Sequence, residues 1–370
     1  MRRTMRVVGR VIGGGTILSG IGVVTYANSK FAPSTDETKR RLGRFAEEKD
    51  KRPSPIEGVS RFARATYTCL VCAYEYDSLF RKLENGEYES RKSEAYLRDL
   101  ETLHWRCAER TLELCRDLGG IYVKVGQYVA TLSPIVPEPW TTTLKALQDK
   151  AGSRPFHEIS EFLRKELGVD NIEEIFESFD EEPIAAASLA QVHKAVLRRD
   201  KSEVAVKIQY PYLPNQVAND LYALEFLANA VAKYFPDFEF AWLLPEFEDV
   251  ADIELDFVQE RVNADRMREL LSETSNVYVP RVINDLSGRR VLTMEYVRGE
   301  RVDDFETLSK MSIDPKFVAS KMCEVFGDMM FVHGLVHCDP HPGNLLVRKD
   351  SNGEAQLVVL DHGMYVLCLP

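Results

Sequence analysis

The hydrophobic and polar positions of the chain follow a helical period in its first half and a strand period later. Between residues 96 and 118, apolar side chains recur at steps of three and four, which is one face of an amphipathic helix, and a glycine pair follows. The run IYVKVGQYVATL predicts a second helix, and a third is predicted between Pro155 and Gly168. We therefore expect residues 90–168 to be helical.

Short β-branched runs replace the helical period after Glu182. QVHKAVL and EVAVKIQ, separated by the turn-like RRDKS, predict a hairpin, and RRVLTMEYV predicts another strand. Helices are predicted over residues 217–235 and 322–332, and a second hairpin joins NLLVRK to AQLVVLD through DSNG. No internal repeat is visible. This order of strands and helices is typical of an α+β protein with two lobes.

The composition describes a folded globular protein, with 45% hydrophobic and 28% charged residues. The length of 370 residues accommodates two ordinary domains or one two-lobed unit. The formal net charge of −11 would repel a phosphate backbone, so no nucleic acid partner is expected.

The N-terminal segment differs in charge from the rest of the chain. Five basic residues precede the first acid, Asp36, so the remainder carries −16 (−11 minus +5). Residues 11–27 are uncharged and lie at the short end of what spans a bilayer. A mitochondrial presequence, an inner-membrane anchor, a secretory signal and a helix of a cytosolic protein are all compatible with this pattern. We expect mitochondrial targeting with retention at the inner membrane.

The seven cysteines are scattered and odd in number, which argues against a secreted disulfide scaffold. Cys69 and Cys72 form a CxxC, but no second pair stands at a suitable distance. Packing in the core is therefore favoured over metal binding or redox chemistry for these two thiols.

Four motifs in a fixed order suggest phosphoryl transfer. VAVK places Lys207 on a strand, where its ammonium can be held against phosphate oxygens. ELDFVQE offers three carboxylates on one predicted helix as partners of this lysine, namely Glu254, Asp256 and Glu260. Phosphoryl transfer requires positioning and neutralisation of several negative oxygens rather than covalent chemistry, which suits a lysine and metal-binding groups.

The other two motifs supply acids and an amide. HCDPHPGN has the histidine, aspartate and asparagine spacing of a kinase catalytic loop, in which Asp339 would accept the substrate hydroxyl proton and Asn344 would hold a metal ion. LDHG follows a strand and places Asp361 where it would bind another Mg²⁺ ion. His337 is expected to bond the loop backbone rather than to act as a catalyst.

Zinc is the alternative for the HCDPH segment. His337, Cys338, Asp339 and His341 are all residue types that ligate zinc. The prolines and glycine of the segment suit a turn better than a rigid ligand array. A zinc site would also leave Lys207, Asn344 and Asp361 unexplained.

The motifs KVGQ, AAASLAQVHKA, VAVK, ELDF and HCDPHPGNLLV resemble those of the UbiB or aarF-domain-containing family of atypical kinases, over about residues 96–364. The resemblance implies an α+β, two-lobed protein-kinase-like fold with an N-terminal helical KxGQ extension. Five segments are expected: a targeting or anchor segment, a linker with a helical lead-in, the KxGQ extension, a small lobe and a partial large lobe, at residues 1–28, 29–89, 90–180, 181–298 and 299–370.

The resemblance also implies site residues. An alanine-rich loop replaces the glycine-rich loop over the nucleotide, at Ala185, Ala186, Ala187 and Ser188. The KxGQ helix, with Lys124 and Gln127 as regulatory residues, folds over the cleft, where Lys124 meets Glu254 and Asp256, and Glu260 orients Lys207. Glu295 and Val297 belong to MEYV, which is interpreted as a hinge strand that bonds adenine through its backbone.

The implied function is binding of ATP with Mg²⁺, and phosphotransfer to a lipid, quinone-related or other small molecule, or ATPase activity, in support of the mitochondrial inner membrane. A regulatory pseudokinase scaffold at that membrane is the alternative. A family member would continue well beyond Pro370, so we expect a truncated isoform or an incomplete gene model with an incomplete large lobe.

Overall fold

The computed structural model describes residues 55–133, 135–147, 153–211, 213–235 and 243–367. The predicted targeting segment, residues 1–28, lies outside them. The chain divides into two compact units, one built from residues up to 149 and 212–248, and the other from residues 150–211 and 249–370. Across the described ranges, no helix combines the length and the apolarity that a membrane span requires.

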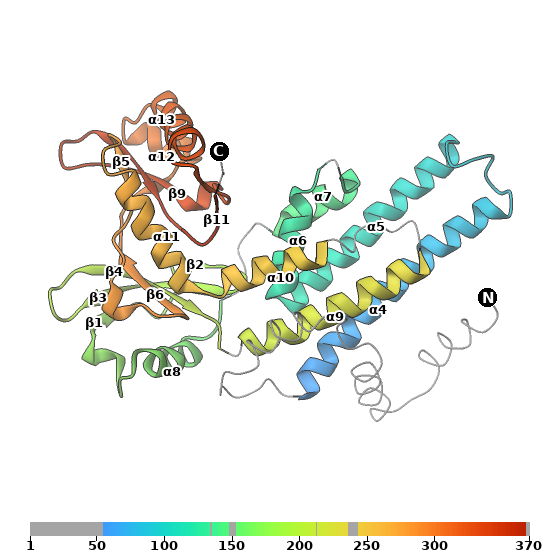
Figure 1. Ribbon diagram of the computed structural model, residues 1–370, viewed down its shortest axis with the longest axis horizontal. Helices are drawn as coiled ribbons and strands as arrows, with labels where there is room; N and C mark the ends of the chain where they lie inside the picture. The colour runs from blue at the N-terminus through green and yellow to red at the C-terminus, as the bar shows by residue number, and fades with distance from the viewer. Residues whose placement is uncertain (1–54, 134, 148–152, 212, 236–242, 368–370) are drawn as a thin grey trace. The chain divides into compact units, whose positions relative to one another are not determined.

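The first unit is helical. Its longest helices, α4 and α5, lie side by side, and α9 packs along α4 (Figure 1). Gly119 and Gly120 both have positive φ and separate α5 from α6, as the sequence predicts. Arg61 on α4 binds Asp220 on α9 through Nε at 3.0 Å and Nη2 at 2.5 Å. The helices of this unit are α4 (Pro55–Glu84), α5 (Glu94–Leu118), α6 (Ile121–Thr131), α7 (Glu138–Leu144), the 3-10 turn η1 (Lys145–Leu147) and α9 (Leu213–Tyr234).

The second unit begins with an antiparallel sheet in the order β1-β3-β4-β6, with β2 added beside β3. The predicted hairpin is confirmed as β3 and β4, and RRVLTMEYV contributes β6. The 3-10 turn η2 (Ile172–Glu174) leads into the sheet, and η3 (Asn284–Leu286) precedes β6. The main elements are α8 (Phe156–Leu167), β1 (Phe176–Phe179), β2 (Ala185–Ala186), β3 (Ala190–Leu197), β4 (Glu203–Gln209) and β6 (Val291–Glu295).

Another sheet of the second unit has the order β5-β10-β9-β7. The predicted second hairpin is confirmed as β9 and β10, and β8 pairs with β11 beside it. Val325, Met329, Leu345 and Val359 are buried in one core between this sheet and α13. The elements are β5 (Val277–Tyr278), β7 (Glu300–Arg301), α12 (Phe305–Lys310), α13 (Pro315–Asp328), the π-helical turn η4 (Met329–His333), β8 (Leu335–His337), η5 (Pro342–Asn344), β9 (Leu345–Lys349), β10 (Ala355–Val359) and β11 (Tyr365–Leu367).

One predicted element is wrong. ELDFVQE was expected on a single helix, but α10 (Leu243–Glu254) ends within it and α11 (Phe257–Leu270) begins after a break. Asp256 has extended backbone and its carboxylate accepts the Val258 N–H at 3.0 Å, so it caps α11. An aspartate is a strong N-cap, and capping the first turn outweighs continuation of the preceding helix.

The compact units do not follow the five predicted segments. Helix α9 falls within residues 181–298 in the sequence, yet it clusters with the helical unit. The division into a targeting segment, linker, extension and two lobes stays a prediction.

Candidate functional site

The centre of the site is Lys207 on β4. It lies between Val206 and Ile208, both fully buried, and its own side chain is 16% exposed. Nζ donates to both carboxylate oxygens of Glu260, at 2.8 and 2.9 Å, and to Oδ2 of Asp361 at 3.2 Å. The predicted pairing of Glu260 with Lys207 is therefore present, and three elements meet at one ammonium.

Glu260 lies one turn into α11, on the face that turns toward β4, and it is buried. Burial raises the pKa of the Glu260 carboxyl to about 7, although contact with Lys207 favours its ionised form. Burial alone would lower the pKa of Lys207, but the charges of Asp361 and Glu260 outweigh it and raise this pKa above the ordinary value. One ammonium between two carboxylates leaves an excess of negative charge when all three are ionised.

Asp361 follows β10 in an unusual backbone conformation. Its φ is +43°, in the left-handed region that a non-glycine residue seldom adopts. Oδ1 accepts the Gly363 N–H at 3.1 Å, and the Asp361 carbonyl accepts a hydrogen bond from His337 Nε2 at 2.8 Å. Such strain persists only where the surroundings fix it, and it is concentrated at functional sites.

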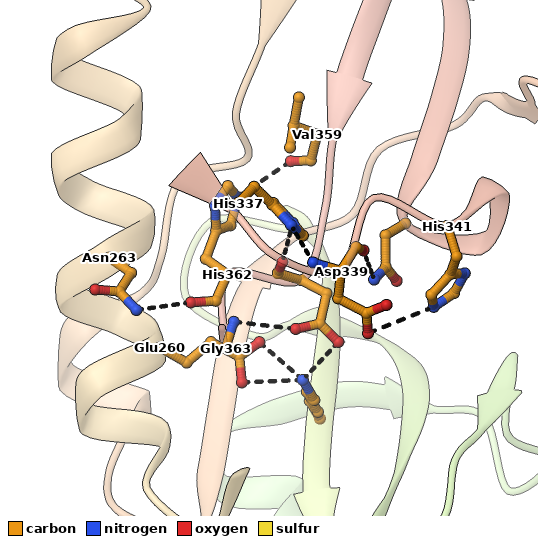
Figure 2. A network of polar contacts seen from close by, with 11 residues as sticks. Glu260, Asn263, His337, Asp339, His341, Val359, His362 and Gly363 are labelled. Atoms are coloured by element: carbon orange, nitrogen blue, oxygen red, sulfur yellow. Dashed lines mark hydrogen bonds and ion pairs between the residues drawn. The ribbon is translucent and has the colours of Figure 1, made fainter. Parts of the chain in front are cut away.

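His337 links the two acidic loops. Its Nδ1 accepts the backbone N–H of Asp339 at 3.0 Å, while its Nε2 donates to the Asp361 carbonyl, as Figure 2 shows. These two bonds require the neutral tautomer with its proton on Nε2. The expectation that His337 bonds the loop backbone is confirmed, and the ring aligns Asp339 with Asp361.

Asn344 closes the HCDPHPGN loop. Its Nδ2 donates to the Asp339 carbonyl at 3.0 Å, which leaves its Oδ1 as the acceptor that a cation could use. Asn344 is buried, whereas the Asp339 carboxylate is 43% exposed. His341 Nδ1 accepts the Gly343 N–H at 3.0 Å, and its Nε2 is 4.0 Å from Asp339 Oδ2. Loop bonds thus occupy both ring nitrogens of His337 and Nδ1 of His341.

Two residues that the sequence analysis missed hold the Asp361 loop. Asn263, three residues after Glu260 on α11, donates from Nδ2 to the His362 carbonyl at 2.9 Å (Figure 2). The His362 ring is buried, with Nδ1 2.8 Å from the Tyr365 hydroxyl and Nε2 3.2 Å from the Val359 carbonyl. Burial lowers the pKa of His362 to about 4, so its ring is neutral near pH 7. The helical spacing from Glu260 was the available signal for Asn263.

The alanine-rich loop is a tight turn between β2 and β3. Ala185 and Ala186 pair with Val192 and Gln191, and the Ala187 N–H donates to the Ala190 carbonyl at 2.8 Å. The Tyr210 hydroxyl holds the Ala187 carbonyl at 3.0 Å. The role of this loop, which includes Ser188, over a nucleotide stays a prediction.

The predicted hinge residues join the two sheets of the second unit. Glu295 ends β6, and its N–H donates to the Arg281 carbonyl at 2.9 Å. The Glu295 carboxylate accepts the Tyr278 hydroxyl at 2.5 Å. With its N–H engaged, Glu295 could offer adenine its carbonyl only, and Val297 would have to supply the donor.

The four predicted regulatory residues lie on or at the ends of three helices. Lys124 and Gln127 lie on α6, Glu254 ends α10 and Asp256 caps α11. Gln127 Nε2 donates to the Leu147 carbonyl at 2.8 Å, which fixes α6 to the turn η1. The pairing of Lys124 with Glu254 and Asp256 stays a prediction.

The donor set fits magnesium better than a softer metal. The Asp361 carboxylate and the Asn344 amide oxygen are hard ligands, and Mg²⁺ prefers a few protein oxygens completed by water and phosphate. In the part of the chain that the structure describes, no three His, Cys, Asp or Glu side chains form a metal-binding group. A site built from one carboxylate and one amide would have to take its remaining ligands from a bound phosphate and water.

The protein family that the sequence matches is one of kinase-like domains, in agreement with the geometry of the site. Residues 146–368 match the model of the ABC1 atypical kinase-like domain, and the chain belongs to this family. It is 42% identical to AarF domain-containing protein kinase 1 of Xenopus laevis over 83% of this chain and 58% of the relative. It is also 39% identical to the probable serine/threonine-protein kinase abkD of Dictyostelium discoideum, over 84% of this chain and 44% of the relative. The chain thus spans about half the length of these curated relatives.

A solved structure is also similar in part. It is the complex of Rv3197 from Mycobacterium tuberculosis with erythromycin, with 25% identity, a TM-score of 0.49, and coverage of 68% of this chain and 62% of that chain. The kinase-like fold class that the motifs imply is confirmed by the family match.

Proposed function

We propose that the chain binds ATP with Mg²⁺ and transfers its terminal phosphoryl group to a small molecule or to water. The observation that carries this proposal is the convergence of Glu260 and Asp361 on the Lys207 ammonium, from three separate elements. The Lys207 ammonium can neutralise part of the negative charge of a triphosphate. The carboxylates around it can bind the metal ion that neutralises the rest.

Each residue has a distinct role in this proposal. Lys207 holds phosphate oxygens and Glu260 orients it, while Asn344 and Asp361 hold the metal ion. Mg²⁺ would supply charge neutralisation on the phosphate oxygens. The Asp339 carboxylate, which is 43% exposed, accepts the proton of the attacking hydroxyl. His337 fixes the position of the Asp339 loop relative to the Asp361 loop.

A nucleotide titration of the full chain, with and without Mg²⁺, tests this proposal. We expect Lys207→Ala and Asp361→Asn each to weaken binding at least about tenfold, equivalent to about 1.4 kcal/mol. Chelation of Mg²⁺ should weaken binding to wild type, and should have less effect in Asp361→Asn. Lys201→Ala, which removes an exposed lysine on the β3–β4 turn, is the matched control. Unchanged binding in both site variants would exclude a nucleotide at this site.

Turnover separates catalysis from nucleotide sensing. Asp339→Asn should bind nucleotide as wild type does but lose most ATP turnover, because the amide cannot accept the proton. If wild type itself binds but never turns over nucleotide, the chain acts as a pseudokinase scaffold. Full turnover in Asp339→Asn would exclude Asp339 as the base.

The substrate and location belong to the same proposal. We assign the chain to the mitochondrial inner membrane, with a lipid or a quinone-related molecule as the acceptor. The basic, acid-free start of the sequence supports this location, and the family resemblance supports the substrate class. Import of a reporter fused to residues 1–28 into isolated mitochondria tests the location. Comparison of lipids and quinones in cells with and without the protein tests the substrate.

A further inference from the structure

Three of the helical unit's cysteines lie close to the contact between α4 and α5. Cys69 and Cys72 are on α4 and half-buried, and Cys107 on α5 is fully buried. The three thiols are free. The sequence predicts that the two CxxC cysteines pack in the core. The structure also places one of them, Cys72, near Cys107, which lies outside the CxxC pattern.

The contacts between the helices place Cys72 opposite Cys107. The Tyr76 hydroxyl is 2.6 Å from His104 Nδ1, so these two residues face each other across the antiparallel pair. Cys72 lies four residues before Tyr76 on α4, and Cys107 lies three residues after His104 on α5. Cys72 packs against the buried cluster that contains Cys107, so the two thiols lie at the same contact between α4 and α5. A disulfide between them requires Cα atoms no more than about 7 Å apart, a separation that packed helices reach where small side chains face each other.

Charges on the same face distinguish the two thiols. Arg110 Nη1 is 2.8 Å from Glu75 Oε2. Interaction with the neighbouring Cys107 thiol lowers the pKa of the Cys72 thiol, burial opposes this, and the charge of Arg110 adds to the lowering. The pKa of Cys107 is raised, first by its interaction with Cys72 and then by burial. The lowered pKa and the partial exposure of Cys72 both favour it as the attacking thiol, with Cys107 as its buried partner.

Cys69 provides the contrast within the same motif. Burial raises the pKa of the Cys69 thiol to about 11, so it stays protonated at neutral pH. Cys115, also on α5, is buried with its pKa raised to about 12. Only Cys72 among these helical-unit thiols combines partial exposure, a lowered pKa and a thiol partner.

We propose that Cys72 and Cys107 form a peroxide-reactive thiol pair, in which Cys72 attacks the oxidant and Cys107 closes a disulfide between α4 and α5. The Cys72 thiolate forms a bond to one oxygen of hydrogen peroxide, the O–O bond breaks, and the departing hydroxide takes a proton and leaves as water. The Cys107 sulfur then attacks the Cys72 sulfenic acid, and the S–O bond breaks. The hydroxyl leaves as a second water with the Cys107 proton. Both sulfurs are oxidised and peroxide is reduced.

A disulfide between α4 and α5 would hold α5 in place, and α5 is the helix against which the KVGQ helix α6 packs. On α5, the Cys115 sulfur packs directly against Gly126 of α6, since a Cβ on this glycine would lie 3.4 Å from it. A covalent bond between α4 and α5 restricts the unfolded chain and holds the helix that carries this contact. The oxidised protein should therefore unfold at a higher temperature than the reduced one.

Peptide mapping of the peroxide-treated full chain tests the proposal. After free thiols are alkylated and the chain is digested, we expect one peptide pair joined through Cys72 and Cys107, with the loss of two hydrogen atoms. Cys69→Ser should retain this link and Cys72→Ser should lose it. In Cys107→Ser, the reaction should stop at a Cys72 sulfenic acid, which a cyclic 1,3-diketone traps. The melting temperature should rise on oxidation in wild type and in Cys69→Ser, but not in Cys72→Ser.

The wild-type map decides the outcome without any variant. Cys72 and Cys107 recovered fully alkylated after peroxide treatment would overturn the proposal, and so would a link between Cys69 and Cys72. Because Cys107 is buried, Cys107→Ala serves as a second variant, and circular dichroism shows which of the two is folded. Failure of the sulfenic acid to appear on Cys72 in a folded variant would also contradict the assignment of the attacking thiol.

Discussion

Lys207 and Glu260 meet through both carboxylate oxygens, at 2.8 and 2.9 Å from the ammonium, although they are 53 residues apart in the chain. The pair is largely buried, with side-chain exposures of 16% and 4%. It joins β4 to α11, and so connects the sheet to the helix that also holds the Asp361 loop. The contact therefore serves the fold of the second unit as well as the proposed site.

Removal of one partner of this pair should be costly. We expect Glu260→Gln and Lys207→Met each to lower the free energy of unfolding by about 3 kcal/mol, because each leaves a buried charge with less compensation. The double variant should lose less than the two single losses together. Urea unfolding of the three variants measures this coupling.

The exposed pair Lys310–Glu306 on α12, at 2.7 Å, is the matched control. Either alanine variant of this pair should shift the free energy of unfolding by less than about 0.5 kcal/mol. Additive losses at Lys207 and Glu260 would show that the buried pair carries no mutual stabilisation.

The two histidines of the HCDPHPGN loop should respond differently to replacement. His337→Ala leaves the Asp339 N–H and the Asp361 carbonyl without their bonds to the ring, which costs about 1–3 kcal/mol of stability. Because the two acidic loops lose their link, nucleotide affinity should also fall. His341→Ala removes an exposed ring and a hydrogen bond from the Gly343 N–H that water can replace, so it should cost less than His337→Ala. Urea unfolding and nucleotide titration of both variants test the difference, and equal effects would contradict the assigned role of His337.

The sequence predicts the strands well because their hydrophobic pattern and the turn between them agree. VAVK is a run of three buried aliphatic residues that ends at Lys207, and RRDKS is a hairpin turn, so β3 and β4 follow from local rules. LDHG likewise places Asp361 after a strand. These motifs carry their own local structure, and the structure brings Lys207 and Asp361 together, whereas their roles at a nucleotide stay predictions.

The same local rules predict neither the helix break within ELDFVQE nor the hydrogen bonds that hold the Asp361 loop. Asp256 can continue a helix or cap one, and its local sequence does not show that Phe257 packs against the sheet where α11 begins. Asn263 bonds a carbonyl 99 residues away, and its spacing from Glu260 indicates a shared helix face but does not identify that partner. Such contacts depend on tertiary placement, which a local period does not encode.

Gly126 in KVGQ should tolerate no side chain. A Cβ there would lie 2.3 Å from Leu147 Cδ1, and Leu147 is itself buried. Although alanine favours a helix by up to about 1 kcal/mol over glycine, overpacking of this kind costs about 1–3 kcal/mol, so Gly126→Ala should destabilise the chain. Gly327→Ala on α13, with nothing within 4 Å of its Cβ, should be neutral or stabilising. Thermal unfolding of both variants compares them, and a stabilised Gly126→Ala would show that α6 can move away from η1.

His362 should give the stability of the chain a pH dependence in the acid range. Burial, and to a lesser degree the neighbouring His337, lowers the pKa of His362 to about 4, against its ordinary value of 6.5. Between pH 6.5 and about 4 the unfolded chain therefore binds a proton that the folded chain does not, and stability falls as the pH is lowered through this window. The full effect is about 3 kcal/mol, and below about pH 4 this contribution no longer changes.

His362→Gln should remove this part of the pH dependence of stability, whereas His157→Gln, at an exposed histidine, should retain it. Urea unfolding at a series of pH values measures the difference, and parallel pH profiles for wild type and His362→Gln would show that the buried ring is not the group that titrates.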